Sequence, residues 1–170
     1  MNQILFQNGL TGSTLIVSPN GETHKLEALT ENSLPYLEVL AVNEKGSIIK
    51  TTAENFRSTP NVKKLYKITS FNGHTIEATE NQKFLLGDGQ WVTTKQLQTG
   101  DVLKAGLLTN DGITSKKDIA LQLNYILTIE ELNLPEPVKS YSFTVENHQN
   151  LFIGQKINKS LSLICVNNEN

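Results

Sequence analysis

Near the centre of the 170-residue chain lies the stretch Gly73–Leu86, which reads GHTIEATENQKFLL. It begins at the turn dipeptide Asn72-Gly73 and continues with alternating polar and apolar residues at Thr75–Ala78. Asn-Gly beside such alternation is among the strongest short-range signals for a β-hairpin. The apolar end of the stretch precedes a second turn, Gly87-Asp88-Gly89, and then Trp91-Val92. The stretch therefore predicts two consecutive hairpins.

The same pattern continues on both sides of this stretch. Thr14–Val17 leads into the turn Pro19-Asn20-Gly21, and Leu37–Val42 leads into Asn43–Gly46. Further segments rich in β-branched and aromatic residues are Leu65–Ile68, Tyr141–Val145, Leu151–Ile153 and Ser160–Val166. Seven or more short strands at this spacing predict an all-β fold.

One region departs from the strand pattern. From Lys116 to Ile129, apolar residues recur at helical spacing, at Ile119, Leu123, Ile126 and Leu127. We expect one short helix near 116–129, ended before Pro135-Glu136-Pro137, which we interpret as a connector.

Composition indicates one compact domain. The chain is 38% hydrophobic, which is enough to bury a core at this length. It carries 15 basic and 17 acidic residues, a net charge of -2, without runs of like charge. This balance argues against a nucleic-acid partner and against a polybasic membrane surface.

Cys165 is the only cysteine, so an intrachain disulfide and a multi-cysteine metal site are excluded. No apolar stretch approaches the 18 or so residues of a membrane span, and Met1–Leu10 lacks the pattern of a signal peptide. We expect a cytoplasmic protein that does not insert into membranes and binds no cofactor or metal. Export by a dedicated secretion system remains open.

Three motifs in order resemble the Hint (Hedgehog/intein) family. Gly9–Ile16, followed by Pro19-Asn20-Gly21 and Leu26–Leu29, is similar to the opening segment of these domains. Gly73–Leu86 resembles the second motif, which has a Thr-x-x-His core, and Leu97–Leu103 continues the match. Val138–Ile153 and Leu163–Asn168 are similar to the late segments.

The resemblance implies a compact horseshoe of hairpins, like a mini-intein without a homing endonuclease. Residues 9–170 would form a single Hint-like domain, and residues 1–8 an N-terminal extension comparable to an extein remnant. The stretch at about 107–137 lies outside the match, as an insertion or linker too short for an endonuclease.

The resemblance also shows which catalytic positions are changed. Gly9 stands where the family has a nucleophilic cysteine or serine, so it offers no group to attack the preceding carbonyl. Thr79 is retained at the oxyanion position, but Gln82 replaces the histidine that protonates the leaving amide. A carboxamide can donate a hydrogen bond but cannot deliver a proton at neutral pH.

The late segments differ as well. Ser142 stands at the position of an aspartate, and Asn167 replaces the histidine that assists cyclisation of the terminal asparagine, here Asn168. Glu169 occupies the acceptor position. His148 lies in the late motif, where some family members use a histidine; a histidine in a polar turn is the simpler interpretation.

Other candidate residues have structural interpretations. We expect His74 to face solvent on a strand, Cys165 to be a buried hydrophobe, and Gly100-Asp101 to form a turn. We expect Trp91 to anchor the core; the alternative is a half-exposed side chain at a sheet edge that contacts a partner. His24 has no assigned role. Ser33, a rival nucleophile, lies well inside the domain.

Three functional hypotheses follow. The first is a catalytically silent Hint-fold protein that binds an unidentified protein partner as a scaffold or adaptor. The second is an autoprocessing protein that still cleaves, at Asn168-Glu169 or through an unrecognised nucleophile. The third is an inactivated form of a working intein. Changes at several separate positions favour the first, and no residue indicates the oligomeric state.

Overall fold

The computed structural model describes residues 9–110 and 117–167, and most of this part of the chain is strand. Its elements are β1 (Leu10–Thr11), β2 (Leu15–Val17), β3 (Thr23–Lys25), α1 (Leu26–Glu31), β4 (Tyr36–Val42), β5 (Ile48–Ser70), β6 (Thr75–Ala78), β7 (Lys83–Leu85), β8 (Trp91–Thr93), the 3₁₀ helix η2 (Thr94–Gln96), β9 (Val102–Asn110), β10 (Lys117–Val145), β11 (Asn150–Ile157) and β12 (Ser160–Asn167). The expected all-β fold is confirmed.

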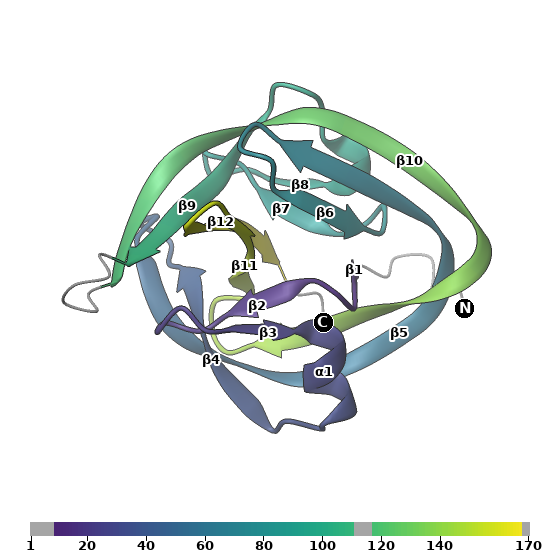
Figure 1. The fold of residues 1–170 in the computed structure, drawn as a ribbon, viewed down its shortest axis with the longest axis horizontal. Helices are drawn as coiled ribbons and strands as arrows, with labels where there is room; N and C mark the ends of the chain where they lie inside the picture. The colour runs from purple at the N-terminus through teal and green to yellow at the C-terminus, as the bar shows by residue number, and fades with distance from the viewer. Residues whose placement is uncertain (1–8, 111–116, 168–170) are drawn as a thin grey trace.

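Within the described residues the strands form one sheet. Its order is β3-β2-β11-β12-β9-β10-β1-β6-β5-β4, with β7 and β8 attached to β12. In Figure 1 the long strands β5 and β10 curve around the outside, and β2, β11 and β12 lie inside the curve. All the pairings are antiparallel, as expected for a chain of hairpins.

The hairpin turns lie where the sequence predicted them. Ser70 and His74 close the turn at Asn72-Gly73, where the Ser70 N–H donates to the His74 carbonyl at 2.9 Å. Gly73 has φ +96°, a conformation that glycine adopts at little cost. The turn at Gly100-Asp101 is also confirmed, because the Gln98 N–H donates to an Asp101 carboxylate oxygen at 2.9 Å.

The predicted helix near 116–129 is wrong. Residues 117–129 belong to β10, whose Lys117–Tyr125 segment pairs with Asn110–Val102 of β9. Burial there alternates with a period of two: Ile126 is buried, whereas Leu123 is 80% exposed. The pairing of this segment with β9 and β5 overrides its helical spacing. In the strand, the apolar residues that followed this spacing lie on both faces.

The prolines after this segment do not end an element either. Pro135 and Pro137 lie within β10, where its register with β5 shifts between Asn133 and Val138. Proline is tolerated at such bulges because its missing N–H is not needed there. The described parts of the stretch 107–137 therefore belong to β9 and β10.

Two clusters of buried hydrophobic side chains form the core of the curved sheet. The larger includes Phe84 and Phe143, and the smaller includes Phe152 and Cys165. Cys165 is fully buried, as expected, and burial raises the pKa of its thiol. Trp91 was predicted as a core anchor, but it is 39% exposed because β8 pairs only with β7, at the margin of the sheet.

One short helix was not predicted. The helix α1 places Leu26 and Leu29 in the core, and its six residues are too few for a periodic signal. No helix of the described residues has the length and apolarity that crossing a membrane requires.

The prediction that His74 faces solvent is also wrong. Its side chain is 1% exposed, and its Nδ1 lies 2.9 Å from Ser162 Oγ on β12. Asn72 Oδ1 accepts hydrogen bonds from Ser70 Oγ, the His74 N–H and Asn124 Nδ2. This buried polar network joins the β5–β6 turn to β10 and β12, and burial lowers the pKa of His74 to about 4.

We predict that His74 makes stability depend on pH between about 6.5 and 4. In this range the unfolded chain binds a proton at position 74 that the native protein does not, so stability falls as pH decreases. A shift from 6.5 to about 4 corresponds to about 3 kcal/mol, fully lost below pH 4. Urea unfolding at several pH values measures this loss.

His74→Gln should flatten this part of the pH profile, because a carboxamide does not titrate in this range. A wild-type His74 ring that titrates near pH 6.5 by NMR would contradict the prediction.

Candidate functional site

Gly9 lies immediately before β1, buried between two strands that are distant in sequence. Leu10 pairs with Ala78 on β6 and with Tyr141 on β10. The Gly9 carbonyl accepts hydrogen bonds from the Thr79 N–H at 3.1 Å and the Thr79 hydroxyl at 3.5 Å. The structure therefore brings together two of the positions singled out by the resemblance.

The space around Gly9 is tight. A Cβ at this position would lie 3.1 Å from both Cβ and Oγ of Ser140, and 3.3 Å from the Tyr141 carbonyl oxygen. Ser140 is 1% exposed, and its hydroxyl contacts Thr59 Oγ1 on β5. A side chain introduced at position 9 would require Ser140 to shift slightly, because both contacts are shorter than ordinary van der Waals contact.

Gln82 ends a buried turn that begins at Thr79. The Gln82 N–H donates to the Thr79 carbonyl at 3.2 Å, and the Gln82 carbonyl accepts from Thr94 N at 2.7 Å and Thr94 Oγ1 at 2.8 Å. Gln82 itself is 2% exposed. The start of η2 thus fixes the backbone at the position where the family has its histidine.

The carboxamide of Gln82 reaches the end of β12. Its Nε2 lies 3.0 Å from the carbonyl oxygen of Asn167 and 3.1 Å from Asn167 Oδ1. The Lys83 N–H also donates to Asn167 Oδ1, at 3.3 Å. Gln82 and Asn167, which replace the two histidines of the resemblance, are therefore hydrogen-bonded to each other.

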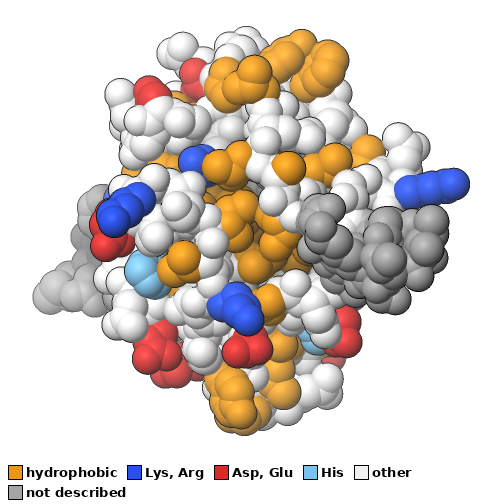
Figure 2. Space-filling view, turned by 90° about the vertical axis from the view of Figure 1, so that its left-hand side faces the viewer, with side chains coloured by type: hydrophobic (Ala, Val, Ile, Leu, Met, Phe, Trp, Pro, Cys, Tyr) orange, Lys and Arg blue, Asp and Glu red, His pale blue; other side chains and the backbone are white. Residues whose placement is uncertain are grey.

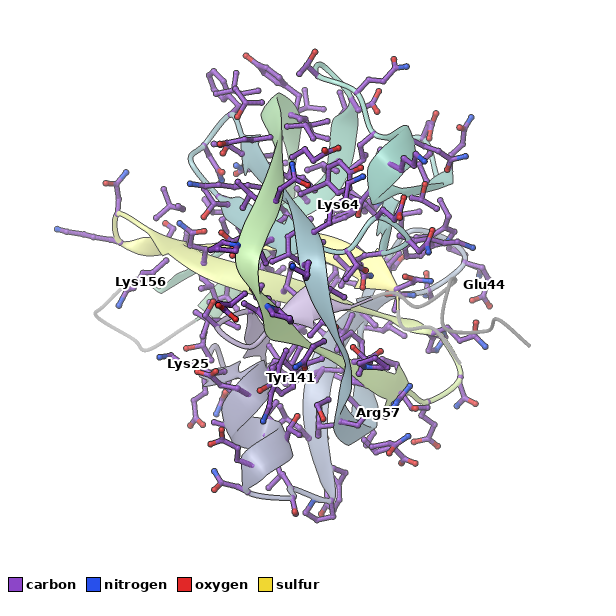
Figure 3. All side chains as sticks on the ribbon, turned by 90° about the vertical axis from the view of Figure 1, so that its right-hand side faces the viewer. Lys25, Glu44, Arg57, Lys64, Tyr141 and Lys156 are labelled. Carbon is purple, nitrogen blue, oxygen red and sulfur yellow. The ribbon has the colours of Figure 1, made fainter. Side chains whose placement is uncertain are left out.

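Ser142 lies on β10, one residue beyond the Tyr141 that pairs with Leu10, and faces Arg57 of β5 across the pairing. Figure 3 shows Tyr141 and Arg57 on these two strands. Burial raises the pKa of Tyr141, and the carboxylates of Glu27 and Glu31 on α1 raise it further. The phenol is therefore neutral at pH 7.

His148 lies in the polar turn that follows β10, as the simpler interpretation predicted. Its Nδ1 is 3.9 Å from Glu44 Oε2, and it borders a cavity of about 480 Å³ together with Trp91 and Lys104. No hydrogen bond joins the His148 ring to Gly9, Thr79 or Gln82 in the part of the chain described.

Asn168, the candidate for cyclisation, lies outside the described residues. Asn167 is the last residue of β12 and pairs with Asn150 on β11. Among the side chains that are placed, no group of three or more His, Cys, Asp and Glu residues is arranged to hold a metal ion.

The sequence did not identify Ser140, the residue closest to the missing side chain of Gly9. Its neighbours in sequence give no sign of this, because positions 9 and 140 are 131 positions apart and the β1–β10 pairing brings them together. Thr94 and its contacts with Gln82 were missed for a related reason, because they join two turns that are 12 positions apart in the sequence.

Neither a sequence family nor a curated protein matches this chain. Solved structures do. A Ssp DnaB mini-intein variant is similar with a TM-score of 0.72 and 21% identity over 95% of each chain. The DnaB intein from Synechocystis sp. gives 0.73 and 20% over 96% of this chain and 100% of that one.

The bacterial intein-like domain from Clostridium thermocellum has a TM-score of 0.69 and 18% identity, and the match covers 95% of this chain and 99% of the domain. At these identities the similarity establishes the fold. The near-complete coverage of mini-inteins and of an intein-like domain leaves no place for an additional endonuclease domain in the matched region. The chain therefore has the Hint fold of inteins and intein-like domains, without an endonuclease domain.

Proposed function

We propose that this chain is a catalytically silent Hint-fold protein that serves as a binding module for another protein. Two observations support the loss of catalysis. Gly9 has no side chain, and Gln82 is hydrogen-bonded to Asn167. The chemistry of the fold needs a nucleophile and a proton donor at these positions. The residues present supply neither.

The N-terminal cleavage step of the family lacks two of its requirements in this chain. An acyl shift at Asn8-Gly9 needs a thiol or hydroxyl on residue 9, and glycine has none. Thr79 still directs its N–H and hydroxyl toward this end of the site, but they bind the Gly9 carbonyl. An oxyanion position without a nucleophile has no reaction to stabilise.

The C-terminal cleavage step, cyclisation of Asn168, lacks the histidine that would assist it at position 167. Asn167 does not titrate near neutral pH, and its carbonyl and side-chain oxygens both accept from Gln82. Cyclisation of Asn168 would therefore proceed only at the slow rate of unassisted asparagine. The hydrogen bonds between Gln82 and Asn167 stabilise the packing of the Thr79–Gln82 turn against the end of β12.

An exposed apolar face supports the proposed binding of a protein partner. On β10, Leu121, Leu123 and Tyr125 alternate outward, and Tyr125 pairs with the exposed Val102 of β9. The Phe71 ring, 60% exposed, stacks on Tyr125 with centroids 4.9 Å apart. We call Phe71, Val102, Leu121, Leu123, Tyr125 and Leu127 the ribbon face.

Contiguous apolar surface of this kind marks interaction sites in proteins. Figure 2 shows hydrophobic side chains gathered at the top and through the middle of the side that carries the β9–β10 hairpin. The low net charge and the absence of basic runs favour a protein partner over nucleic acid. A single, buried cysteine fits a reducing compartment, so we place this partner in the cytoplasm.

We predict that the purified chain stays intact. After prolonged incubation at neutral pH its mass should remain 18.9 kDa, because neither cleavage step has its catalytic groups. Intact-mass spectrometry checks this. A fragment ending at Asn168 with a succinimide mass would instead establish autoprocessing.

The variant Gly9→Cys/Gln82→His/Asn167→His tests the hypothesis that the chain is an inactivated form of a working intein. It should also remain uncut, because a Cβ at position 9 would lie only 3.1 Å from Ser140 and because Ser142 still stands where the family has its aspartate. Efficient cleavage by this variant would identify the chain as a disabled form of a working intein.

We predict that Gln82→Ala destabilises the fold by about 1–3 kcal/mol, because the partly buried oxygens of Asn167 would lose the hydrogen bonds from Gln82 Nε2. Gln98→Ala, a change at an exposed position, should have little effect. Chemical denaturation measures both. Equal stability of the two variants would show that Gln82 is not a structural link.

We predict that Leu123→Asp lowers capture of the partner by about tenfold or more, since it places a charge at the centre of the ribbon face. Tyr36→Ser, at a residue 62% exposed on β4, is the control and should leave capture unchanged. A pull-down with the tagged chain, with the bait mass checked, measures this. Undiminished capture by a folded Leu123→Asp protein would remove the ribbon face from the proposal.

A further inference from the structure

The strand β4 lies at one end of the sheet. It pairs with β5 on one side, and no strand of the described residues pairs with it on the other. Figure 1 shows it at the lower left of the fold. Backbone groups of an end strand that point away from its neighbour can pair with an added strand, which is a common mode of peptide recognition.

The register with β5 shows which residues of β4 point outward. Hydrogen bonds across an antiparallel pair alternate, so every second residue of β4 directs its N–H and C=O away from β5. Val42 is one of these, because its N–H donates to Asn150 Oδ1 at 2.9 Å and its carbonyl accepts from Asn150 Nδ2 at 3.0 Å. The register has no shift between Tyr36 and Val42. Leu40, Glu38 and Tyr36 therefore direct their backbone groups outward as well.

The side chain of Asn150 occupies this edge as a peptide group would. It is a buried carboxamide that donates to Val42 and accepts from it. A carboxamide carries the same N–H and C=O groups as the backbone. The protein thus closes one end of the β4 edge with amide hydrogen bonds of the kind that an added strand would make.

Two outward-pointing residues of β4 have no such cap. In the part of the chain that the structure describes, no group bonds to the outward N–H or C=O of Tyr36 and Glu38. Leu40, between them and Val42, is 2% exposed, so little of it is accessible. Tyr36 and Glu38 are exposed. We call Tyr36–Glu38 the open edge.

Space for an added chain lies beside these residues. A hollow of about 570 Å³ borders all three residues of the open edge. Its other borders are residues 18–20 of the β2–β3 turn and Lys50 of β5. This volume falls within the usual range of ligand sites, about 300–1,000 Å³. A short extended chain can therefore approach β4 here.

The side chains of the open edge favour one kind of sequence. A residue that pairs with Glu38 has its side chain on the same face, directly opposite the carboxylate. Glu38 has no ion pair within the described residues, so a lysine or arginine is favoured at that position. The two flanking residues would point to the other face, where Leu37 packs against the core. Apolar side chains are favoured there.

A second copy of this chain fits the open edge less well. Two β4 strands paired about a two-fold axis at Glu38 would place two carboxylates directly opposite each other, and like charges in such pairs are destabilising. A register that pairs Tyr36 with Glu38 of the copy supplies no cation either. The charge at the open edge therefore favours a basic peptide over self-association.

We propose that the open edge binds an extended peptide segment in which a lysine or arginine stands between two apolar residues, added antiparallel to β4 like the other strands of the sheet. The inference rests on the proposed function, because this segment belongs to the protein partner, but it uses a surface separate from the ribbon face. Tyr36 contributes only its backbone groups, whereas Glu38 also contributes its carboxylate.

The test uses the full chain labelled with ¹⁵N and observed by amide NMR. One probe is the peptide acetyl-Thr-Val-Lys-Val-Thr-amide, and the matched probe has glutamate in place of lysine. The lysine peptide should shift the amide resonances of Tyr36 and Glu38 saturably, with a dissociation constant on the order of 1 mM. It should also slow hydrogen exchange of the Glu38 N–H. The glutamate peptide should bind about tenfold more weakly.

Glu38→Lys should reverse this preference, so that the glutamate peptide binds about tenfold more tightly than the lysine peptide. Two variants are controls. Glu136→Lys makes the same change at an exposed residue of β10 that does not border the hollow. Tyr36→Ser keeps the backbone of the open edge. Both should bind the two peptides as the wild type does.

Three results would overturn the proposal. They are the absence of a saturable shift at Tyr36 and Glu38 with the lysine peptide up to about 10 mM, an unchanged peptide preference in Glu38→Lys, and a shift of these amides with protein concentration alone. The last would assign the open edge to a second copy. None of them alters the capture experiment with Leu123→Asp, so failure of this inference is distinguishable from failure of the proposed function.

Discussion

The antiparallel pairing of β5 with β10 is the constraint on which the rest of this structure depends. Residues 53–70 align with residues 126–145, so two strands far apart in sequence form one curved ribbon around the core. Register shifts near Pro135, Pro137 and Pro60 let the ribbon bend without loss of pairing elsewhere. The inner strands β2, β11 and β12 fit within this curve (Figure 1).

The same pairing builds the candidate site. It presents Ser140 and Tyr141 to the N-terminal strand β1, which lies between β10 and β6 and thereby places Gly9 against Thr79. β12, an inner strand of the same sheet, contributes Asn167, whose oxygens accept hydrogen bonds from Gln82. Gly9 is thus bonded to Thr79, and Gln82 to Asn167, by hydrogen bonds between uncharged groups. Fold and chemistry are separable in this way because few residues carry the chemistry.

Local sequence was a good guide to some elements and a poor guide to others. The turns at Asn72-Gly73 and Gly100-Asp101 were predictable because turn chemistry is set by the residues themselves. The segment 117–129 was not, since a strand exposed on one side can carry apolar residues on both faces. His74 shows the same limit: its sequence neighbours are polar turn residues, but Ser162 and Asn124 come from β12 and β10 and enclose it.

The sequence alone determined the all-β class, the order of the hairpins and the absence of a side chain at position 9. These follow from local residue types and from the resemblance, and need no knowledge of distant contacts. Only the tertiary structure decided that Gln82 bonds to Asn167, that Ser140 lies against Gly9, and that His74 is buried against Ser162. Each of these depends on strand pairings between residues 85 to 131 positions apart, and such pairings are selected by packing of the whole sheet rather than by any short stretch of chain.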